Sequence, residues 1–169
     1  ASGAPGPAYW QQRADYEIDA ELDEKNLRLN GSETITYYNN SPDPLSYLWV
    51  QLDENQHKAG SDNKLTERSK MSTQMDYNAL TNIINPENKL GVQILKVTDE
   101  KGTALPYTIN NTMMRIDLPA TLQPKQKYKL RITWNYNIAN RMIDGGRGGY
   151  EYFAEDDNYL FTITQWFPR

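Results

Sequence analysis

The stretch Lys127-Tyr128-Lys129-Leu130-Arg131-Ile132-Thr133-Trp134-Asn135-Tyr136-Asn137-Ile138 shows the most regular alternation in the chain. Apolar and aromatic residues occupy every second position, and charged or polar residues stand between them. This period of two is typical of a β-strand with one buried face. Each buried side chain of this kind contributes about 1.5–3 kcal/mol, and a slip of one residue would expose all of them. We therefore expect residues 128–138 to form the central strand of the core.

Earlier segments also alternate as strands do. Residues 16–22 place apolar side chains on one face and acidic ones on the other. Residues 27–39 continue the pattern, with Gly31 interrupting it at an expected bulge. Residues 45–52 are apolar at nearly every position, which predicts a strand covered on both faces. Short turns join the three segments, so we expect an antiparallel meander.

Later segments complete the predicted fold. Residues 92–98 form a strand, and residues 105–109 and 112–118 flank Asn110-Asn111 as a hairpin would. Residues 119–124 are expected to form a loop. The sequence thus predicts an all-β fold of saddle-like antiparallel sheets with a sandwich-like packing.

Two segments fall outside this pattern. Residues 53–89 are polar and carry His57, the only histidine. We expect one long surface excursion there, with a turn or two of helix. Residues 1–14 read as a linker or N-terminal extension, and residues 15–169 as one domain.

The amino-acid composition excludes several classes of function. A net charge of −4 argues against a nucleic-acid groove, and the absence of cysteine excludes disulfides and thiolate zinc ligands. No run of residues is apolar enough for a membrane span, and no signal peptide is visible. The absence of cysteine is compatible with both the cytoplasm and the periplasm, and we slightly favour a periplasmic or secreted location.

The sequence lacks the common motifs of zinc peptidases and serine hydrolases. It contains no His-Glu-x-x-His and no Gly-x-Ser-x-Gly. Asp156-Asp157 with Glu155 offers oxygen ligands for Ca²⁺, but such a cluster is more often a solvated turn. We assign no catalytic residue and no metal ligand. Three Asn-x-Ser/Thr matches, at Asn30, Asn39 and Asn110, are short enough to occur by chance.

The final stretch carries the candidate binding residues. Glycine-rich residues 145–149 are either a flexible loop or a loop that closes over a partner surface. An apolar strand is expected at residues 159–163, and its end would fix Gln165 in place. A primary amide donates and accepts hydrogen bonds without titrating, which suits an amine or a peptide carbonyl. The simpler interpretation is a polar residue at a strand end.

Five aromatic residues are candidates for stacking on sugars. Ordinary packing at the core and its rim is the simpler explanation for them. They are Tyr9, Trp10, Tyr150, Tyr152 and Trp166.

Several motifs, taken in order, resemble the N-terminal domain of M1-family zinc aminopeptidases, most closely a bacterial branch. They are Tyr9-Trp10-Gln11-Gln12, Asp15-Tyr16-x-Ile18 with Leu22, Leu29-x-Gly31-x-Glu33-x-Ile35-x-Tyr37-x-Asn39-x-Ser41, Leu45-x-x-Leu48, Leu52-x-x-Asn55 and Thr164-Gln165. The resemblance covers nearly the whole chain and is weakest over residues 53–89. The family's Ala-Arg and Phe-Pro-x-x-Asp signature after Thr-Gln is absent, unless Phe167-Pro168-Arg169 is a variant of its beginning. With the abrupt stop at Arg169, this departure suggests a chain cut before the catalytic domain.

The resemblance implies a non-catalytic domain that forms one wall of the substrate cleft beside a catalytic domain. Gln165 would contact the N-terminal residue of a peptide substrate, and Trp166 is a candidate for the pocket wall. The zinc and its ligands would belong to the parent enzyme, so this chain alone would neither hydrolyse peptides nor need a cofactor. The alternative is a carbohydrate- or protein-binding β-sandwich module of a larger surface protein.

Overall fold

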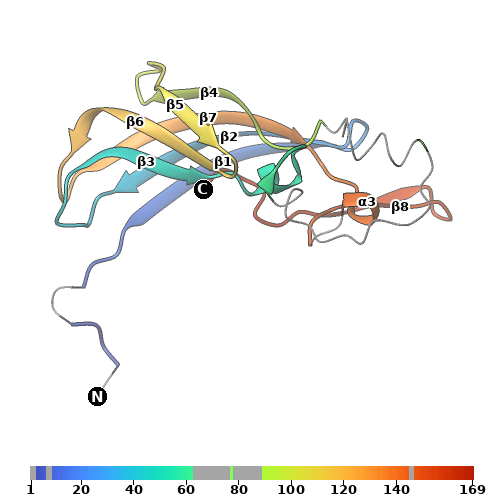
Figure 1. Cartoon of the computed structure of the whole chain (residues 1–169), viewed down its shortest axis with the longest axis horizontal. Coiled ribbons are helices and arrows are strands. Elements are labelled where there is room, and N and C mark those ends of the chain that lie inside the picture. The colour runs from blue at the N-terminus through green and yellow to red at the C-terminus, as the bar shows by residue number, and fades with distance from the viewer. Residues whose placement is uncertain (1–2, 7–8, 63–76, 78–88, 145–146) are drawn as a thin grey trace.

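The computed structural model describes residues 3–6, 9–62, 77, 89–144 and 147–169. Its strands form two antiparallel sheets and a separate hairpin (Figure 1). The four-stranded sheet has the order β1 (Arg13–Asp23), β2 (Arg28–Tyr38), β7 (Lys127–Asn137) and β4 (Gln93–Asp99). The three-stranded sheet has the order β3 (Leu45–Gln51), β6 (Met113–Leu122) and β5 (Tyr107–Asn110). The hairpin joins β8 (Gly149–Phe153) and β9 (Asn158–Thr162).

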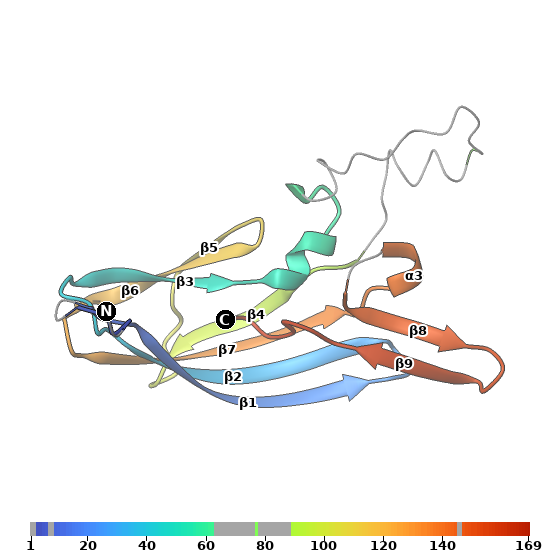
Figure 2. The ribbon, with the colours of Figure 1, turned by 90° about the horizontal axis from the view of Figure 1, so that it is seen from below.

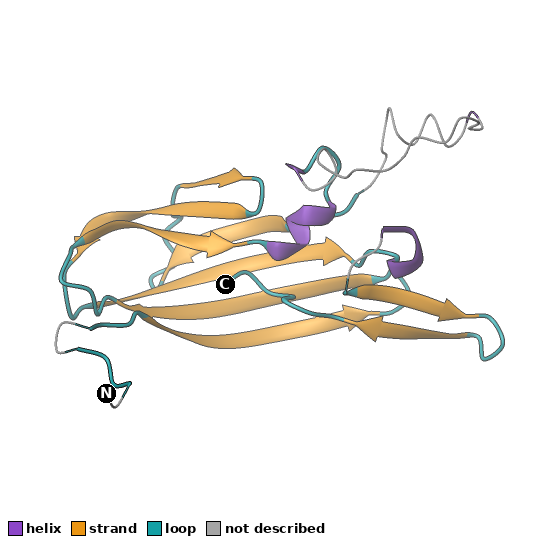
Figure 3. Cartoon of the chain, turned by 60° about the horizontal axis from the view of Figure 1, so that its bottom comes forward, coloured by secondary structure: helices purple, strands orange, loops and turns teal. Residues whose placement is uncertain are grey.

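The two sheets form two layers that enclose the hydrophobic core (Figure 2). The β8–β9 hairpin extends past one end of the four-stranded sheet, and the C-terminus lies between the layers (Figure 3). In the connections, the described residues include the short helices η1 (Asp53–His57) and α3 (Arg141–Asp144). The prediction of an all-β fold with antiparallel, sandwich-like sheets is confirmed.

The predicted central strand is an inner strand of the larger sheet. β7 pairs with β2 on one side and with β4 on the other. Its alternating residues Leu130, Ile132, Trp134 and Tyr136 are almost fully buried. The sequence period therefore identified both the strand and its buried face.

The expected meander is wrong at its third strand. β1 and β2 pair as neighbours, but β3 leaves the sheet and pairs with β6 in the other layer. The turn at residues 39–44 leads the chain from the larger sheet to the smaller one. The side-chain amide of Asn39 holds this turn, because it donates to the backbone carbonyls of Asp43 and Leu122, 2.8 and 3.1 Å away. This buried amide joins the turn to β6 rather than to β2.

Two-sided burial of residues 45–52 is also wrong. Leu48, Val50 and Leu52 face the core, whereas Trp49 on the opposite face is 52% exposed. Tyr47 beside it is exposed as well and lies under the Arg115 guanidinium, 4.2 Å from the ring centroid. Large aromatic rings that keep one side in water explain why an apolar run marks only a half-buried strand.

The bulge expected at Gly31 does not occur. The pairing of β2 with both of its neighbours is continuous through this residue. Gly31 lies opposite Trp134, and the indole ring occupies the space of a Cβ at Gly31. The glycine therefore makes room for a side chain and does not mark an extra residue.

The loop expected at residues 119–124 is largely strand. β6 continues to Leu122, which pairs with Leu45 beyond an irregularity in the β3–β6 pairing. Pro119 lies in that irregular stretch, where its missing N–H breaks no ladder bond. The predicted hairpin between β5 and β6 is present, with its turn at Asn111-Thr112, one residue later than expected.

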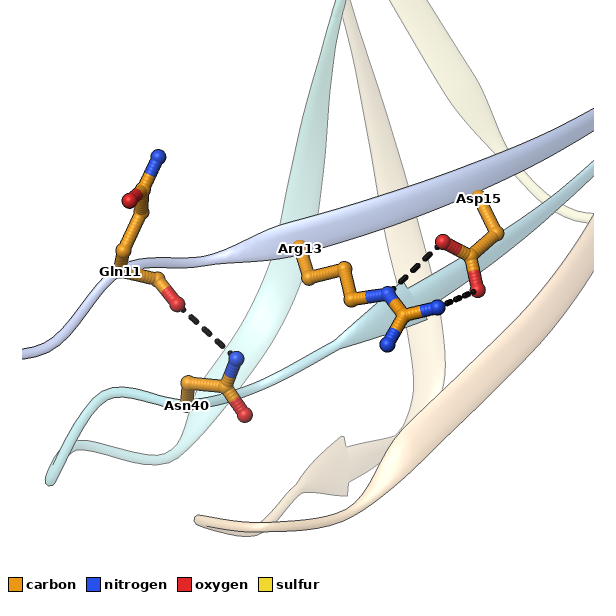
Figure 4. Close-up of polar contacts among 4 residues, drawn as sticks. All are labelled: Gln11, Arg13, Asp15 and Asn40. Atoms are coloured by element: carbon orange, nitrogen blue, oxygen red, sulfur yellow. Dashed lines mark hydrogen bonds and ion pairs between the residues drawn. The ribbon is translucent and has the colours of Figure 1, made fainter.

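The chain enters the sheet at Arg13, after a short stretch held by polar contacts (Figure 4). The Gln11 carbonyl accepts a hydrogen bond from the Asn40 side chain at 2.9 Å, and Arg13 forms an exposed pair with Asp15 at 2.8 Å. The expected excursion at residues 53–89 begins with η1, which supplies the turn of helix. Most of it, residues 63–76 and 78–88, lies outside the described residues.

Candidate functional site

Residues 164–169, the C-terminal segment, follow β9 and run between the two sheets (Figure 2). The strand predicted at residues 159–163 is β9, shifted by one residue. Ile163, just after β9, packs against the core and fixes the start of the segment. The segment carries both candidate binding residues, Gln165 and Trp166.

Gln165 combines an exposed side chain with an unusual backbone. Its φ is 52°, in the left-handed region that residues other than glycine seldom adopt. Within the described part of the chain its amide makes no hydrogen bond to another residue. The amide is therefore available to a ligand, and its position is set by anchored residues on either side.

Trp166 is one of these anchors rather than an exposed ring. It is half-buried and packs on Trp134 of β7, with ring centroids 6.1 Å apart. It also contacts Phe167 edge-to-face at 5.1 Å, and Phe167 in turn contacts Tyr16 of β1 at 5.4 Å. Aromatic pairs in such orientations add about 0.5–1.5 kcal/mol beyond the area they bury. These contacts fix the segment across the larger sheet.

Arg169 fixes the other end of the segment to the smaller sheet. Its backbone N–H donates to the carbonyl of Gln51 at 3.0 Å, and its own carbonyl accepts from the Gln51 N–H. The guanidinium donates through Nε to Asp53 at 3.0 Å. This reciprocal pairing extends the end of β3 as an added strand residue would.

A shallow apolar hollow adjoins Trp166. Its volume is about 300 Å³, and its lining is aliphatic apart from the indole. The lining residues are Ala20, Leu22, Leu29, Ile163 and Trp166. Trp166 thus presents part of its ring to a cavity, and an apolar group of a ligand or partner would fit beside it.

The sequence analysis did not identify two carboxyl groups whose pKa values are raised. Glu33 on β2 is 1% exposed, and burial raises its pKa to about 8. Glu54 on η1 is partly buried, and burial together with the neighbouring charge of Asp53 raises its pKa to about 7. The signal for Glu33 was present in the alternation of β2, which places it on the same face as Leu29 and Ile35.

The structure offers no metal site in the ranges it describes. Across residues 9–62 and 89–144 and the C-terminal residues 147–169, no three His, Cys, Asp or Glu side chains gather closely enough to hold an ion. The acidic turn that was considered for Ca²⁺ joins β8 to β9, and Asp157 there accepts a hydrogen bond from the Tyr152 hydroxyl at 2.7 Å. Among the same residues, no helix is long and apolar enough to cross a membrane.

The glycine-rich stretch is described only in part, because residues 145 and 146 lie outside the described residues. Gly149, with φ of 136°, starts β8, and a Cβ there would lie 2.6 Å from the Ala139 carbonyl. The glycine therefore permits a close backbone approach within this chain. The hypothesis that the loop closes over a partner stays a prediction.

The five candidate aromatics do not form one surface group. Trp166 and Tyr150 pack against the core, whereas Tyr9, Trp10 and Tyr152 are exposed at other places on the chain. Exposed Trp49, on the outer face of β3, was not among the sequence candidates. The apolar character of residues 45–52 concealed it, since it predicted burial on both faces.

No known sequence family matches this chain, and no curated protein sequence matches it. Several solved structures, in contrast, are similar to it. The chain is similar to an M1 zinc metallopeptidase from Deinococcus radiodurans, at 13% identity over 82% of this chain and 24% of that chain, with a TM-score of 0.46. It is also similar to a mutant two-domain M1 zinc metallopeptidase bound to L-tryptophan, at 13% identity over 89% and 27% of the two chains, with a TM-score of 0.49. The chain spans about a quarter of the length of these structures.

Proposed function

We propose that this chain is the non-catalytic N-terminal domain of a bacterial M1-like zinc aminopeptidase. In this proposal it forms one wall of the substrate cleft and helps to bind the N-terminal residue of a peptide. Its partners are the parent's catalytic domain and the peptide itself. The ordered series of motifs from Tyr9 to Gln165 is the sequence basis for the proposal.

One structural observation carries the proposal, namely the state of Gln165. A non-glycine residue in the left-handed region costs about 1–3 kcal/mol and persists only where its surroundings impose it. Here the neighbours Ile163 and Trp166 are held by packing, while the Gln165 side chain faces solvent. Residues held in this way occur preferentially at binding sites, which favours a role in recognition over a passive strand end.

The chemistry follows from the amide group. The Gln165 carbonyl oxygen accepts a hydrogen bond from a protonated amine, and its NH₂ donates to a peptide carbonyl. Neither group titrates, so the contact would not vary with pH through this residue. Trp166 would supply the apolar wall beside it. Zinc in the parent would activate the attacking water, and its ligands would come from the catalytic domain.

The test is Gln165→Ala in the protein that contains this chain together with whatever follows Arg169. A hydrogen bond to a charged amine is worth about 1.5–3 kcal/mol, so kcat/KM for an unblocked peptide should fall about 10- to 100-fold. Gln93→Ala, at an exposed position at the start of β4, is the matched control and should leave kcat/KM unchanged. Unchanged kcat/KM in Gln165→Ala, or a parent without a His-Glu-x-x-His motif, would overturn the proposal.

The second candidate is a carbohydrate- or protein-binding module, and the exposed aromatics favour it. Trp10 and Trp49 are exposed rings on which a sugar could stack. Titration with oligosaccharides should then shift tryptophan fluorescence, and Trp10→Ala or Trp49→Ala should abolish part of the shift. The aminopeptidase proposal expects no shift in the same titration.

A further inference from the structure

A carboxyl group lies in the middle of the inner face of the larger sheet. Glu33 on β2 is flanked by Ile18 of β1 and Ile132 of β7. Within the described part of the chain neither carboxyl oxygen has a hydrogen-bond partner. An ionised carboxylate is strongly disfavoured in such surroundings, and a neutral carboxyl group much less so.

The C-terminal segment crosses the sheet from β7 to β1. On β7 its Trp166 packs on Trp134, and on β1 its Phe167 packs on Tyr16. The rings of Trp166 and Phe167 are themselves in contact, with centroids 5.1 Å apart. These two adjacent rings therefore bridge two strands that are separated by β2.

Strand pairing fixes where this bridge lies on β2. Trp134 is opposite Gly31, and Tyr16 is opposite Ile35. Glu33 lies between Gly31 and Ile35 and faces the same side, because side chains two residues apart share a face. The bridge of rings thus passes over Glu33.

We propose that the protonation state of Glu33 controls whether the C-terminal segment stays bound to the sheet. The neutral carboxyl group lets the Trp166–Phe167 bridge remain closed, and the ionised carboxylate favours its opening to admit water. The inference goes beyond the proposed function, because it holds whatever the segment binds.

The other groups near Glu33 do not titrate in the same range. Tyr16 from β1 has a pKa raised by burial and by the charge of Glu33, so it stays neutral. Arg169 from the segment itself also acts on Tyr16, and its guanidinium is paired with Asp53. Trp134 from β7 is uncharged. The smaller sheet contributes Leu48, Val50, Met114 and Ile116 to the buried core cluster.

Linkage gives the direction and size of the effect. The pKa of Glu33 is about 8 in the closed state, against an ordinary value of 4.5 when water reaches the group. The closed state therefore holds a proton that the open state releases between these two values. The open fraction should rise by up to about tenfold per pH unit over that range and level off above pH 8.

The reporter is the Arg169 backbone N–H, which donates to the Gln51 carbonyl. Its solvent exchange would be measured by NMR on the whole chain from about pH 5 to pH 9 and expressed as a protection factor. We expect that factor to fall with pH, while the amides of β7 that pair with β2 keep their protection. In Glu33→Gln, which cannot ionise, the Arg169 factor should be independent of pH.

Two control variants separate Glu33 from other carboxylates. Glu21→Gln removes an exposed charge from β1, and Glu54→Gln removes the other carboxyl group with a raised pKa. Both should keep the pH dependence of the Arg169 protection factor. A flat profile in the wild-type chain, an unchanged slope in Glu33→Gln, or a parallel loss of protection in β7 would each overturn the proposal.

Discussion

Gly31 on β2 lies directly opposite Trp134 on β7, and the indole ring fills the position of the missing side chain. A Cβ at Gly31 would overlap the Cζ2, Cε2 and Cη2 atoms of the ring. Trp134 is almost fully buried and contacts Trp166 of the C-terminal segment. The absence of a side chain at Gly31 thus sets the position of the Trp134 ring. Because Trp134 contacts Trp166, it also influences the position of the candidate site.

Gly31→Ala should therefore destabilise the domain. Because β2 is paired with a strand on each side here, Trp134 must move, and overpacking of this kind costs about 1–3 kcal/mol. Urea denaturation followed by circular dichroism would measure the loss. Gly6→Ala is the control, because a Cβ at Gly6 meets no atom within 4 Å. Equal midpoints for the two variants would contradict the packing described.

The strand period predicted most of the sheet from sequence, and it did so wherever one face is apolar and the other polar. β7 and β1 are of this kind, and both were located within a few residues. The prediction failed where one residue is compatible with two different local structures. Gly31 fits a bulge as well as a space for Trp134, and only the opposite strand decides between them. The departure of β3 into the second sheet depends on long-range contacts of Asn39, which no local pattern reveals.

Asn39→Ala should lower the free energy of unfolding by about 2–4 kcal/mol, because the buried Leu122 carbonyl and the partly buried Asp43 carbonyl would each lose a donor. Asn39 is fully buried, and its oxygen also accepts from the Ser41 hydroxyl at 2.6 Å. Thermal unfolding would measure the effect. Asn40→Ala removes a solvent-exposed amide and should cost well under half as much. If both variants unfold at the same temperature, Asn39 does not hold the turn.

The burial of Asn39 also predicts that this residue carries no glycan when the chain passes through a glycosylating compartment.

The candidate site was predictable only in part. The apolar run at residues 159–163 correctly indicated a strand leading to Gln165 and Trp166. The packing of Trp166 on Trp134 was not predictable, because it joins residues far apart in the sequence. The raised pKa of Glu54 could not be predicted either, because residues 53–89 show no hydrophobic period that would indicate which side chains are buried.

Glu54 should make stability depend on pH. Its pKa is about 7 in the folded chain, against an ordinary value of 4.5. The stabilisation from its protonated form is fully present below pH 4.5 and is lost as pH rises through 7. By linkage this loss is about 1–3 kcal/mol, with some allowance for its partial exposure. Urea midpoints between pH 4.5 and pH 8 would measure it, comparing the wild-type chain with Glu54→Gln. The variant should lose less stability over this range, and an identical slope would show that Glu54 titrates normally.

Gln165→Gly tests whether the backbone at the candidate site is held against its preference. Glycine adopts φ of 52° without steric cost, so the substitution relieves strain in the folded chain. Part of this gain is offset by the greater freedom of glycine in the unfolded chain. We expect unfolding free energy to stay equal or to rise by about 1 kcal/mol, as measured by urea denaturation. Gln165→Ala keeps the strain and removes only an exposed amide, so it should be neutral within about 0.5 kcal/mol. A loss above 1 kcal/mol in either variant would show that the Gln165 side chain stabilises the fold, and would weaken the case that it is kept free for a ligand.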